Sequence, residues 1–233
     1  MPGSCVGTRP AHGPGRLLRS AAVRLAAALL AATLATGAIA AGRTALDAWL
    51  DGLHSLRTGF TQTVKDAQGK VTQRSAGTLL VLRPGRFRWE SHEGTAAADS
   101  GQVMVADGRS VWFYDRDLMQ VTVKPMDAAL SATPVMLLSG GADVRKAFDI
   151  SAAGTHDGLT WVQVKPLGSE ADFRQALLGF GNGQLSQMVL TDKLGQVATL
   201  VFDHAERNAQ VADAEVSFTP PAGVDVIGTA PVR

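Results

Sequence analysis

The segment "GTLLVLRPGRFRWES", residues 77–91, has the pattern of two β-strands joined by a tight turn. Its first half is a short apolar run of the length of a buried strand. Pro84 and Gly85 then interrupt the run, and a Pro-Gly pair is typical of a turn. The segment therefore predicts a β-hairpin and indicates that the surrounding chain is built from antiparallel strands.

The second strand of this hairpin carries aromatic and basic residues in turn. A period of two places Phe87 and Trp89 on one face and Arg86 and Arg88 on the other. The aromatic rings can then line an apolar interior while these two arginines stay in water. Arg83 precedes the turn and lies outside this alternation, so we expect it to have a separate role.

The net charge argues against the other interpretation of this segment, a nucleic-acid surface. Arginines beside aromatic residues are typical of proteins that meet phosphates and stack on bases. The 233 residues carry 22 basic and 21 acidic side chains, but residues 1–40 hold four arginines and no acidic residue. Without that stretch 18 basic and 21 acidic residues remain, a net charge of −3. Nucleic-acid binding depends on neutralising phosphates, so we expect no nucleic-acid partner.

Strand patterns continue on both sides of the hairpin. Turn signals recur every eight to twelve residues, which is the spacing of an antiparallel meander of roughly ten to eleven strands. We expect "AEVSFTPPAG", residues 214–223, to continue this strand pattern. The turn signals fall at residues 68–69, 107–108, 116–117, 181–183, 193–195 and 208.

The first of two helical stretches lies at residues 44–60, where six apolar residues recur at steps of three and four. This spacing predicts one amphipathic helix that ends near Gly59. Thr44 and Asp47 match the capping-box pattern at its start.

The second stretch, residues 126–150, lacks strand alternation. It predicts short helices at residues 127–132 and 134–139 and a third near residues 143–148. Pro134 suits the first turn of a helix, and Gly140 with Gly141 breaks the pattern. These three residues are therefore the expected hinge of a mobile helical segment.

We expect these elements to form one α+β domain at residues 41–233. A sheet of so many strands must curl strongly. The predicted fold is an incomplete, half-open antiparallel β-barrel, with the short helices as a lid over a hydrophobic cavity. Barrel mouths and interiors are common ligand sites.

Residues 1–40 have the pattern of a secretory signal peptide. A basic stretch precedes an uncharged run rich in Ala and Leu, and "AIA" at residues 38–40 supplies a small-x-small cleavage site. We expect cleavage after residue 40 or 41. The alternative is a membrane anchor, since the run is nearly long enough to span a bilayer. Cys5, the single cysteine, lies in this stretch, so the mature chain would carry no disulfide.

The sequence carries no catalytic or metal-binding pattern. Its histidines are dispersed, with no pair spaced to hold a metal on one helix. No Gly-x-Ser-x-Gly elbow is present. The glycine-rich "GFGNG", residues 179–183, leads into strand alternation rather than a helix, so it is a turn. We therefore expect no enzyme, no cofactor and no metal.

Apolar and aromatic side chains recur in the predicted sheet and lid instead. Each of them could belong to an ordinary core, but together they exceed what a helix pair can fill. The candidates for the wall of a cavity are Trp89, Trp112, Met119, Met136, Leu137 and Leu138.

Four stretches resemble the LolA family of outer-membrane lipoprotein carriers, which are periplasmic chaperones. They are "FTQTV", "RPGRFRWE", "ADGRSVWFYDRDLMQVTV" and "TPVMLLSG", the last followed downstream by "FTPPAGVDV". They occur in the family's order and at similar spacing, between residues 44 and 226.

The resemblance implies a role for the chain and for two of its residues. Members of the family take a triacylated lipoprotein from an inner-membrane ABC transporter and pass it to an outer-membrane receptor, LolB. By resemblance, Arg83 bonds to lid backbone in the region 131–141 and latches the lid, and Phe87 belongs to the aromatic part of the cavity. The expected partners of this periplasmic monomer are acylated lipoproteins, the transporter and LolB.

Burial of a methylene is worth about 0.8 kcal/mol, so an acyl chain left in water costs on the order of 10 kcal/mol. Such cargo needs a carrier, and a carrier that releases it needs a lid with two states. A module that senses lipids or lipoproteins and regulates a partner would share the same cavity. The sequence leaves this alternative open, and a hydrolase is a third interpretation that lacks a nucleophile.

Overall fold

The structure is a computed structural model that describes residues 43–94, 100–129, 133–140, 144–169 and 171–230. The predicted leader and the hinge residue Gly141 lie outside these residues. The strands are β1 (Ser55–Lys65), β2 (Val71–Leu82), β3 (Arg86–Glu93), β4 (Gln102–Asp107), β5 (Ser110–Asp115), β6 (Gln120–Pro125), β7 (Phe148–His156), β8 (Leu159–Pro166), β9 (Phe173–Gly181), β10 (Gln184–Asp192), β11 (Val197–Arg207) and β12 (Asp225–Gly228). The helices are α2 (Ala45–Leu50) and α3 (Val135–Ser139), with 3-10 turns η1 (Asp127–Ala129), η2 (Val144–Ala147) and η3 (Asp213–Val216).

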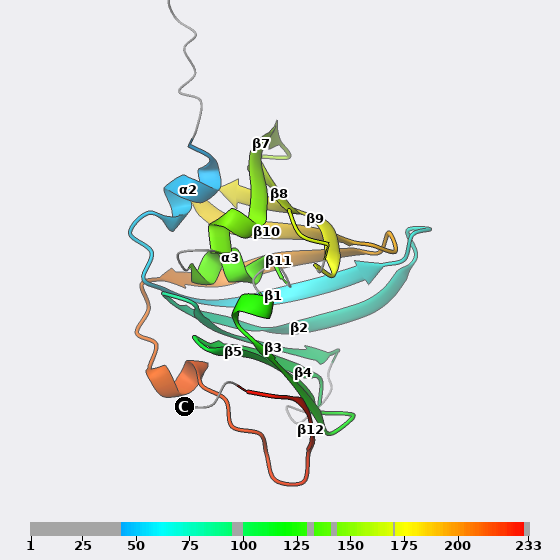
Figure 1. Ribbon diagram of the computed structural model, residues 1–233. Helices are drawn as coiled ribbons and strands as arrows, with labels where there is room; N and C mark the ends of the chain where they lie inside the picture. The colour runs from blue at the N-terminus through cyan, green and yellow to red at the C-terminus, as the bar shows by residue number, and fades with distance from the viewer. Residues whose placement is uncertain (1–42, 95–99, 130–132, 141–143, 170, 231–233) are drawn as a thin grey trace, which may run out of the picture. The chain divides into compact units, whose positions relative to one another are not determined.

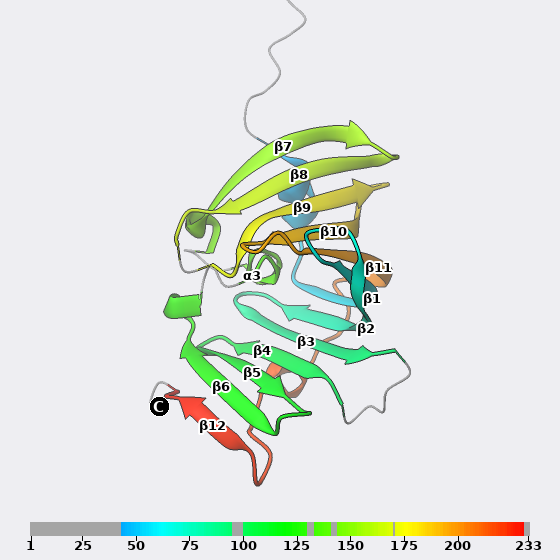
Figure 2. The same ribbon diagram turned by 90° about the vertical axis from the view of Figure 1, so that its right-hand side faces the viewer.

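All twelve described strands join one open sheet, in the order β12-β6-β5-β4-β3-β2-β1-β11-β10-β9-β8-β7 (Figures 1 and 2). The predicted antiparallel meander is confirmed, with twelve strands rather than ten to eleven. Only β12 pairs in parallel, with β6. The strand expected at residues 214–223 is wrong, because η3 overlaps its start and the two prolines, Pro220 and Pro221, have no N–H to donate to a ladder.

The two faces of the sheet are distinguished by the alternation in β3. Phe87 is fully buried in the main core, and Trp89 packs against that core. We call this side the inner face; α3 packs on it against β2 and β3 (Figure 1). The opposite side is the outer face, where Arg86 and Arg88 contact the segment that follows β11. The predicted division of aromatic and basic residues between two faces is confirmed.

The helix predicted for residues 44–60 is much shorter than expected. Its start is as predicted, with the Thr44–Asp47 capping box present. The helix ends at Leu50, and Gly52 has a φ of 66° that turns the chain out of the helix. Leu56 and Phe60 belong to β1, where alternate residues face the core. A spacing of four fits both a helix and a strand, so the apolar pattern continued past the end of the helix.

Gly77 on β2 permits an aromatic contact in the main core. It pairs with Phe60 on β1, and the Phe60 ring stacks on Trp89 with centroids 4.0 Å apart and planes 30° apart. A Cβ at position 77 would lie 1.9 Å from the Glu90 carbonyl oxygen and 2.7 Å from the Phe60 ring. Only glycine therefore fits between these two neighbours.

Candidate functional site

A row of half-buried apolar residues crosses the inner face of the sheet. Trp89 on β3 pairs with Met104 on β4, which pairs with Phe113 on β5. All three pack against the main core without being closed off by it. They line a pocket of about 250 Å³ together with Leu118 and Thr122. Ligand pockets generally span about 300–1,000 Å³, so this opening alone is small for a long-chain ligand.

The remainder of the inner face is filled by side chains of the two helices. All five residues of α3 are buried, and Met136 and Leu138 have 0% exposure. On α2, Leu46 and Trp49 are buried in the same core, with the Trp49 ring 6.0 Å from that of Phe180. The predicted cavity residues on α3 thus lie on the inner face, where they belong to the packed core.

Arg83 lies between the two helices. Its Nη1 donates to the carbonyl oxygens of Leu50, at 2.9 Å, and Leu53, at 3.2 Å, where α2 ends. Burial lowers the pKa of the Arg83 guanidinium from its ordinary value. The group stays charged, because the pKa of arginine lies far above neutral pH. Such a group has five N–H donors. Its two described bonds go to Leu50, the last residue of α2, and to Leu53 in the connection that follows.

On its other side the Arg83 guanidinium faces the end of α3. A Cβ at Gly140 would lie 2.6 Å from Arg83 Nε and Nη2. Gly85, in the turn after Arg83, donates its N–H to the Ser139 carbonyl at 2.8 Å. Gly140 adopts a φ of 70°, which favours glycine, and Pro134 precedes α3 at the N-cap. Arg83 thus contacts the region 131–141 at Gly140. The role of Arg83 as a latch stays a prediction.

Two of the predicted cavity residues lie elsewhere. Trp112 is on the outer face, because its neighbours Val111 and Phe113 point inward; its Nε1 donates to Asp107 at 2.8 Å. Met119 is 46% exposed in the turn between β5 and β6. Neither belongs to the inner row, so their assignment to the cavity wall was wrong.

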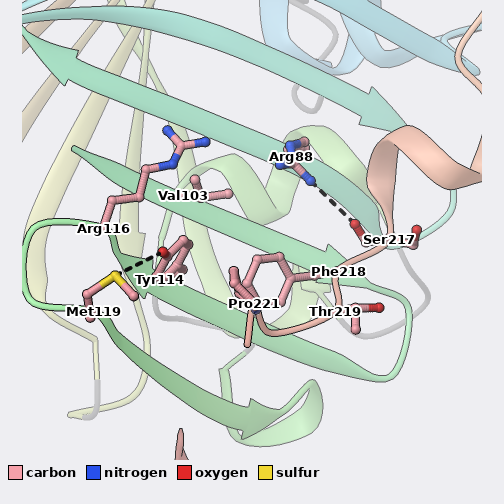
Figure 3. Close-up of a pocket in the computed structure, with 9 residues that line it drawn as sticks. All are labelled: Arg88, Val103, Tyr114, Arg116, Met119, Ser217, Phe218, Thr219 and Pro221. Atoms are coloured by element: carbon pink, nitrogen blue, oxygen red, sulfur yellow. Dashed lines mark hydrogen bonds between the residues drawn. The ribbon is translucent and has the colours of Figure 1, made fainter. Parts of the chain in front are cut away.

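The outer face of β3–β6 is covered by the segment that follows β11. Phe218 from this segment packs 5.6 Å from Trp112 and 6.0 Å from Tyr114. Figure 3 shows Phe218 facing Tyr114, with Arg88 bonded to the Ser217 carbonyl at the rim. The pocket drawn there has a volume of about 480 Å³. Arg88 and Arg116 line this pocket, and their charged groups make it a poor environment for acyl chains.

Arg88 and Arg116 share one carboxylate, that of Glu90, on this outer face. Burial on its own raises the pKa of Glu90, but the hydrogen bonds and charges of Arg88 and Arg116 outweigh it and hold that pKa below its ordinary value. Arg86 bonds to Asp213 at 2.7 Å. The expectation that Arg86 and Arg88 stay in water is met in part: both remain partly exposed on the outer face, and both also bond to the segment that follows β11.

Replacing Glu90 by Gln is expected to lower the free energy of unfolding by about 1–2 kcal/mol at pH 7, because two guanidinium groups lose their shared partner. The depressed folded-state pKa makes this contribution complete above the unfolded-state value, about 4.3, and lost as the pH falls through the folded-state pKa. Urea titrations at several pH values should therefore show wild type and Glu90→Gln converging in acid. In an Arg88→Gln/Arg116→Gln background the difference should vanish. A pH-independent difference would contradict this account.

Among the described residues, no three His, Cys, Asp or Glu side chains gather closely enough to hold a metal ion. Within the same part of the chain, no helix has the length and apolar character needed to span a bilayer. The notable geometry is the apolar inner face, its two helices and the arginine between them.

The profile of the family "Outer membrane lipoprotein carrier protein LolA" matches residues 51–219 of this sequence. The chain belongs to the LolA family. It is 37% identical over 187 residues to an outer-membrane lipoprotein carrier protein of Methylobacillus flagellatus, covering 80% of this chain and 89% of the relative. A relative of the same description from Xanthomonas oryzae pv. oryzae is 39% identical over 190 residues, covering 81% and 88%. The crystal structure of a LolA superfamily protein from Nitrosomonas europaea is 11% identical with a TM-score of 0.46, covering 75% of this chain and 96% of that one.

In this LolA family member, sequence reasoning missed the residues that organise the outer face. Glu90 lies two residues after Arg88, on the same side of a strand, and this spacing alone could have indicated an ion pair. Phe218 carried no comparable signal, because its contacts with Trp112 and Tyr114 join segments about a hundred residues apart. Arg207 and Asn208, which contact the end of α2, were read only as the end of a strand and a turn.

Proposed function

We propose that this protein is a periplasmic carrier of lipoproteins. It binds the acyl chains of outer-membrane-directed lipoproteins released by an inner-membrane ABC transporter and delivers them to the outer-membrane receptor LolB. Residues 1–40 serve as the leader for export. The support is membership of the LolA family and relatives described as outer-membrane lipoprotein carrier proteins.

The observation that carries the proposal is the filling of the inner face by α2 and α3. The bent, open sheet acts as a half-open barrel with α2 against its inner face. The helix α3 acts as the lid, and its apolar side chains occupy the space that acyl chains need. Cargo enters by taking the place of lid side chains such as Met136 and Leu138, which are fully buried. The apolar wall is covered in both states, either by the lid or by lipid.

This exchange explains how a carrier can bind a greasy ligand and still release it. An acyl chain of some 16 methylenes gains on the order of 10 kcal/mol by leaving water. Much of that gain is offset, because the lid must surrender its own apolar contacts and the bonds of Arg83. A difference of a few kcal/mol between closed and open states is then enough to set the direction of transfer.

The proposal is tested by release of lipoproteins from inner-membrane spheroplasts. Purified mature chain, residues 41–233, is incubated with spheroplasts, and lipoproteins in the supernatant are identified by immunoblot and mass spectrometry. We expect a soluble complex of the chain with an acylated protein. Spheroplasts depleted of ATP and a sample without the chain are the controls.

Three outcomes of this experiment are distinguished. Release followed by transfer of the lipoprotein to membranes that contain LolB supports a carrier. Stable binding of lipoprotein without transfer would instead indicate a sensing module, and absence of any acylated protein in the supernatant would overturn the proposal.

A further inference from the structure

Between the end of α2 and the start of β1, every backbone carbonyl oxygen accepts a hydrogen bond. Helices leave their last carbonyl groups without partners inside the helix, so these groups need other donors. Here six consecutive carbonyl oxygens, from Trp49 to His54, each accept a hydrogen bond. Each of these six carbonyls accepts from Arg83, Arg207 or Asn208, and the Leu50 carbonyl also accepts from the Leu53 N–H at 3.2 Å.

These three donors act from two separate strands. Arg83, just after β2, donates its Nη1 to Leu50 and Leu53 and its backbone N–H to His54. Arg207 is the last residue of β11, and its Nη2 donates to Trp49 at 2.8 Å and to Asp51 at 3.0 Å. Its guanidinium carbon also lies 5.7 Å from the centre of the Trp49 ring, within range of a cation–π contact.

Asn208, the residue after β11, makes the remaining hydrogen bonds to this connection. Its Nδ2 donates to the Gly52 carbonyl at 3.1 Å, and its Oδ1 accepts from the His54 N–H at 2.8 Å. Its backbone N–H donates to the Ser55 carbonyl at 2.7 Å. Asn208 has a φ of 58°, a conformation that asparagine tolerates better than most residues. The side chain thus bonds the connection on both its donor and its acceptor sides.

The two sets of bonds differ in what else they touch. The Arg83 guanidinium also lies against Gly140 at the end of α3. The described bonds of Arg207 and Asn208 go to the end of α2 and the start of β1. Withdrawal of the Arg83 guanidinium would therefore remove its contact with Gly140, while the carbonyls of Trp49, Asp51 and Gly52 keep their donors.

We propose that Arg207, together with Asn208, is a second and permanent clasp that keeps α2 docked on the sheet when Arg83 lets go. Arg207 is then a positioning residue, and opening of the lid moves α3 and Gly140 but not α2. Under the carrier function proposed above, on which this consequence rests, Leu46 and Trp49 stay in place as a fixed wall for acyl chains. The chains occupy the space of Met136 and Leu138.

The test is hydrogen exchange, followed by mass spectrometry, of the cargo-free mature chain. Arg207→Gln should speed exchange in residues 45–54 by about tenfold or more, since bonds from a charged donor contribute about 1.5–3 kcal/mol each. Residues 133–140 should stay within about threefold of wild type. Arg83→Leu should speed exchange most in residues 133–140. In residues 45–54 it should give a smaller rise than Arg207→Gln, because the bonds to Leu50 and Leu53 are lost while Arg207 and Asn208 still hold Trp49, Asp51 and Gly52.

Three further variants keep the result interpretable. Arg207→Lys should restore part of the protection, because an ammonium can still reach a carbonyl. Asn208→Gly keeps the backbone conformation and removes both side-chain bonds, so it should act like Arg207→Gln but more weakly, even if Arg207→Gln folds poorly. Arg174→Gln is the matched control, since Arg174 donates to the Lys193 carbonyl in a distant hairpin.

The proposal is overturned if Arg83→Leu exposes both segments equally, or if Arg207→Gln and Asn208→Gly both leave residues 45–54 unchanged. Because the measurement needs no cargo, it decides the clasp independently of the carrier function. A chain that shows the exchange pattern but releases no lipoprotein from spheroplasts would keep the clasp and lose the carrier function.

Discussion

Arg83→Leu is expected to bind lipoprotein and to fail to hand it on. Under the latch role expected for Arg83, its bonds to Leu50 and Leu53 stabilise the closed, empty state. Loss of bonds from a charged donor costs about 1.5–3 kcal/mol each, which shifts the balance toward the open, loaded state by about tenfold or more. Transfer from preloaded chain to membranes containing LolB, followed by sedimentation, should fall by a similar factor.

The capture step provides the internal control for this variant. Release of lipoprotein from spheroplasts should stay close to wild type, because opening needs no bond from Arg83. Arg174→Leu, which removes an exposed arginine from a distant hairpin, should leave both steps unchanged. Normal transfer by Arg83→Leu, with unchanged exchange in residues 133–140, would contradict the latch.

Gly77→Ala is expected to cause the largest loss of stability of any small substitution proposed here. The new methyl group would meet the Glu90 carbonyl at 1.9 Å and the Phe60 ring at 2.7 Å. Neither group can move without a large cost in free energy. The Glu90 carbonyl belongs to the backbone of paired strands, and the Phe60 ring is stacked on Trp89. We expect the free energy of unfolding in urea to fall by about 3 kcal/mol or more.

Thr78→Ala, at the exposed neighbouring position on β2, is the matched control. It should change the free energy of unfolding by less than about 0.5 kcal/mol. A loss below about 1 kcal/mol for Gly77→Ala would mean that β2 and β3 can separate locally without cost, against the close fit described above.

The sequence predicts the sheet well wherever local signals agree with the final contacts. Turns with Gly at residues 69, 108 and 183 join the strands expected on either side of them. Strict alternation from residue 86 to 89 assigns the faces of β3 correctly. Both signals are short in range, and antiparallel neighbours need nothing more to find their partners.

The sequence fails where the deciding contact is distant. The helix at residues 44–60 was drawn too long, because Leu56 and Phe60 are as well spaced for a strand as for a helix. Pairing of β12 with β6 brings together residues about a hundred positions apart. A turn signal predicts pairing only between strands that are adjacent in sequence, so it could not predict this pair.

The candidate site is divided in the same way. The alternation places Trp89 on the inner face. Trp112 was expected in the cavity because a large aromatic ring favours an apolar environment, but the residue type does not indicate which face of the sheet provides it. The alternation of β5 places Trp112 on the outer face, where its ring packs against Phe218. The latch role of Arg83 came from family resemblance and awaits the variant above.

The complete burial of α3 bears on how a receptor could tell a full carrier from an empty one. In the closed state every residue of this helix is hidden. Under the carrier function proposed above, an empty molecule would offer a receptor none of α3 to recognise, whereas a molecule whose cargo had displaced the helix would present its apolar side chains. A receptor that grasps those side chains would sense occupancy before touching lipid. Empty protein would then not compete with loaded protein for the receptor, and transfer would run in one direction because only the bound cargo makes the protein recognisable.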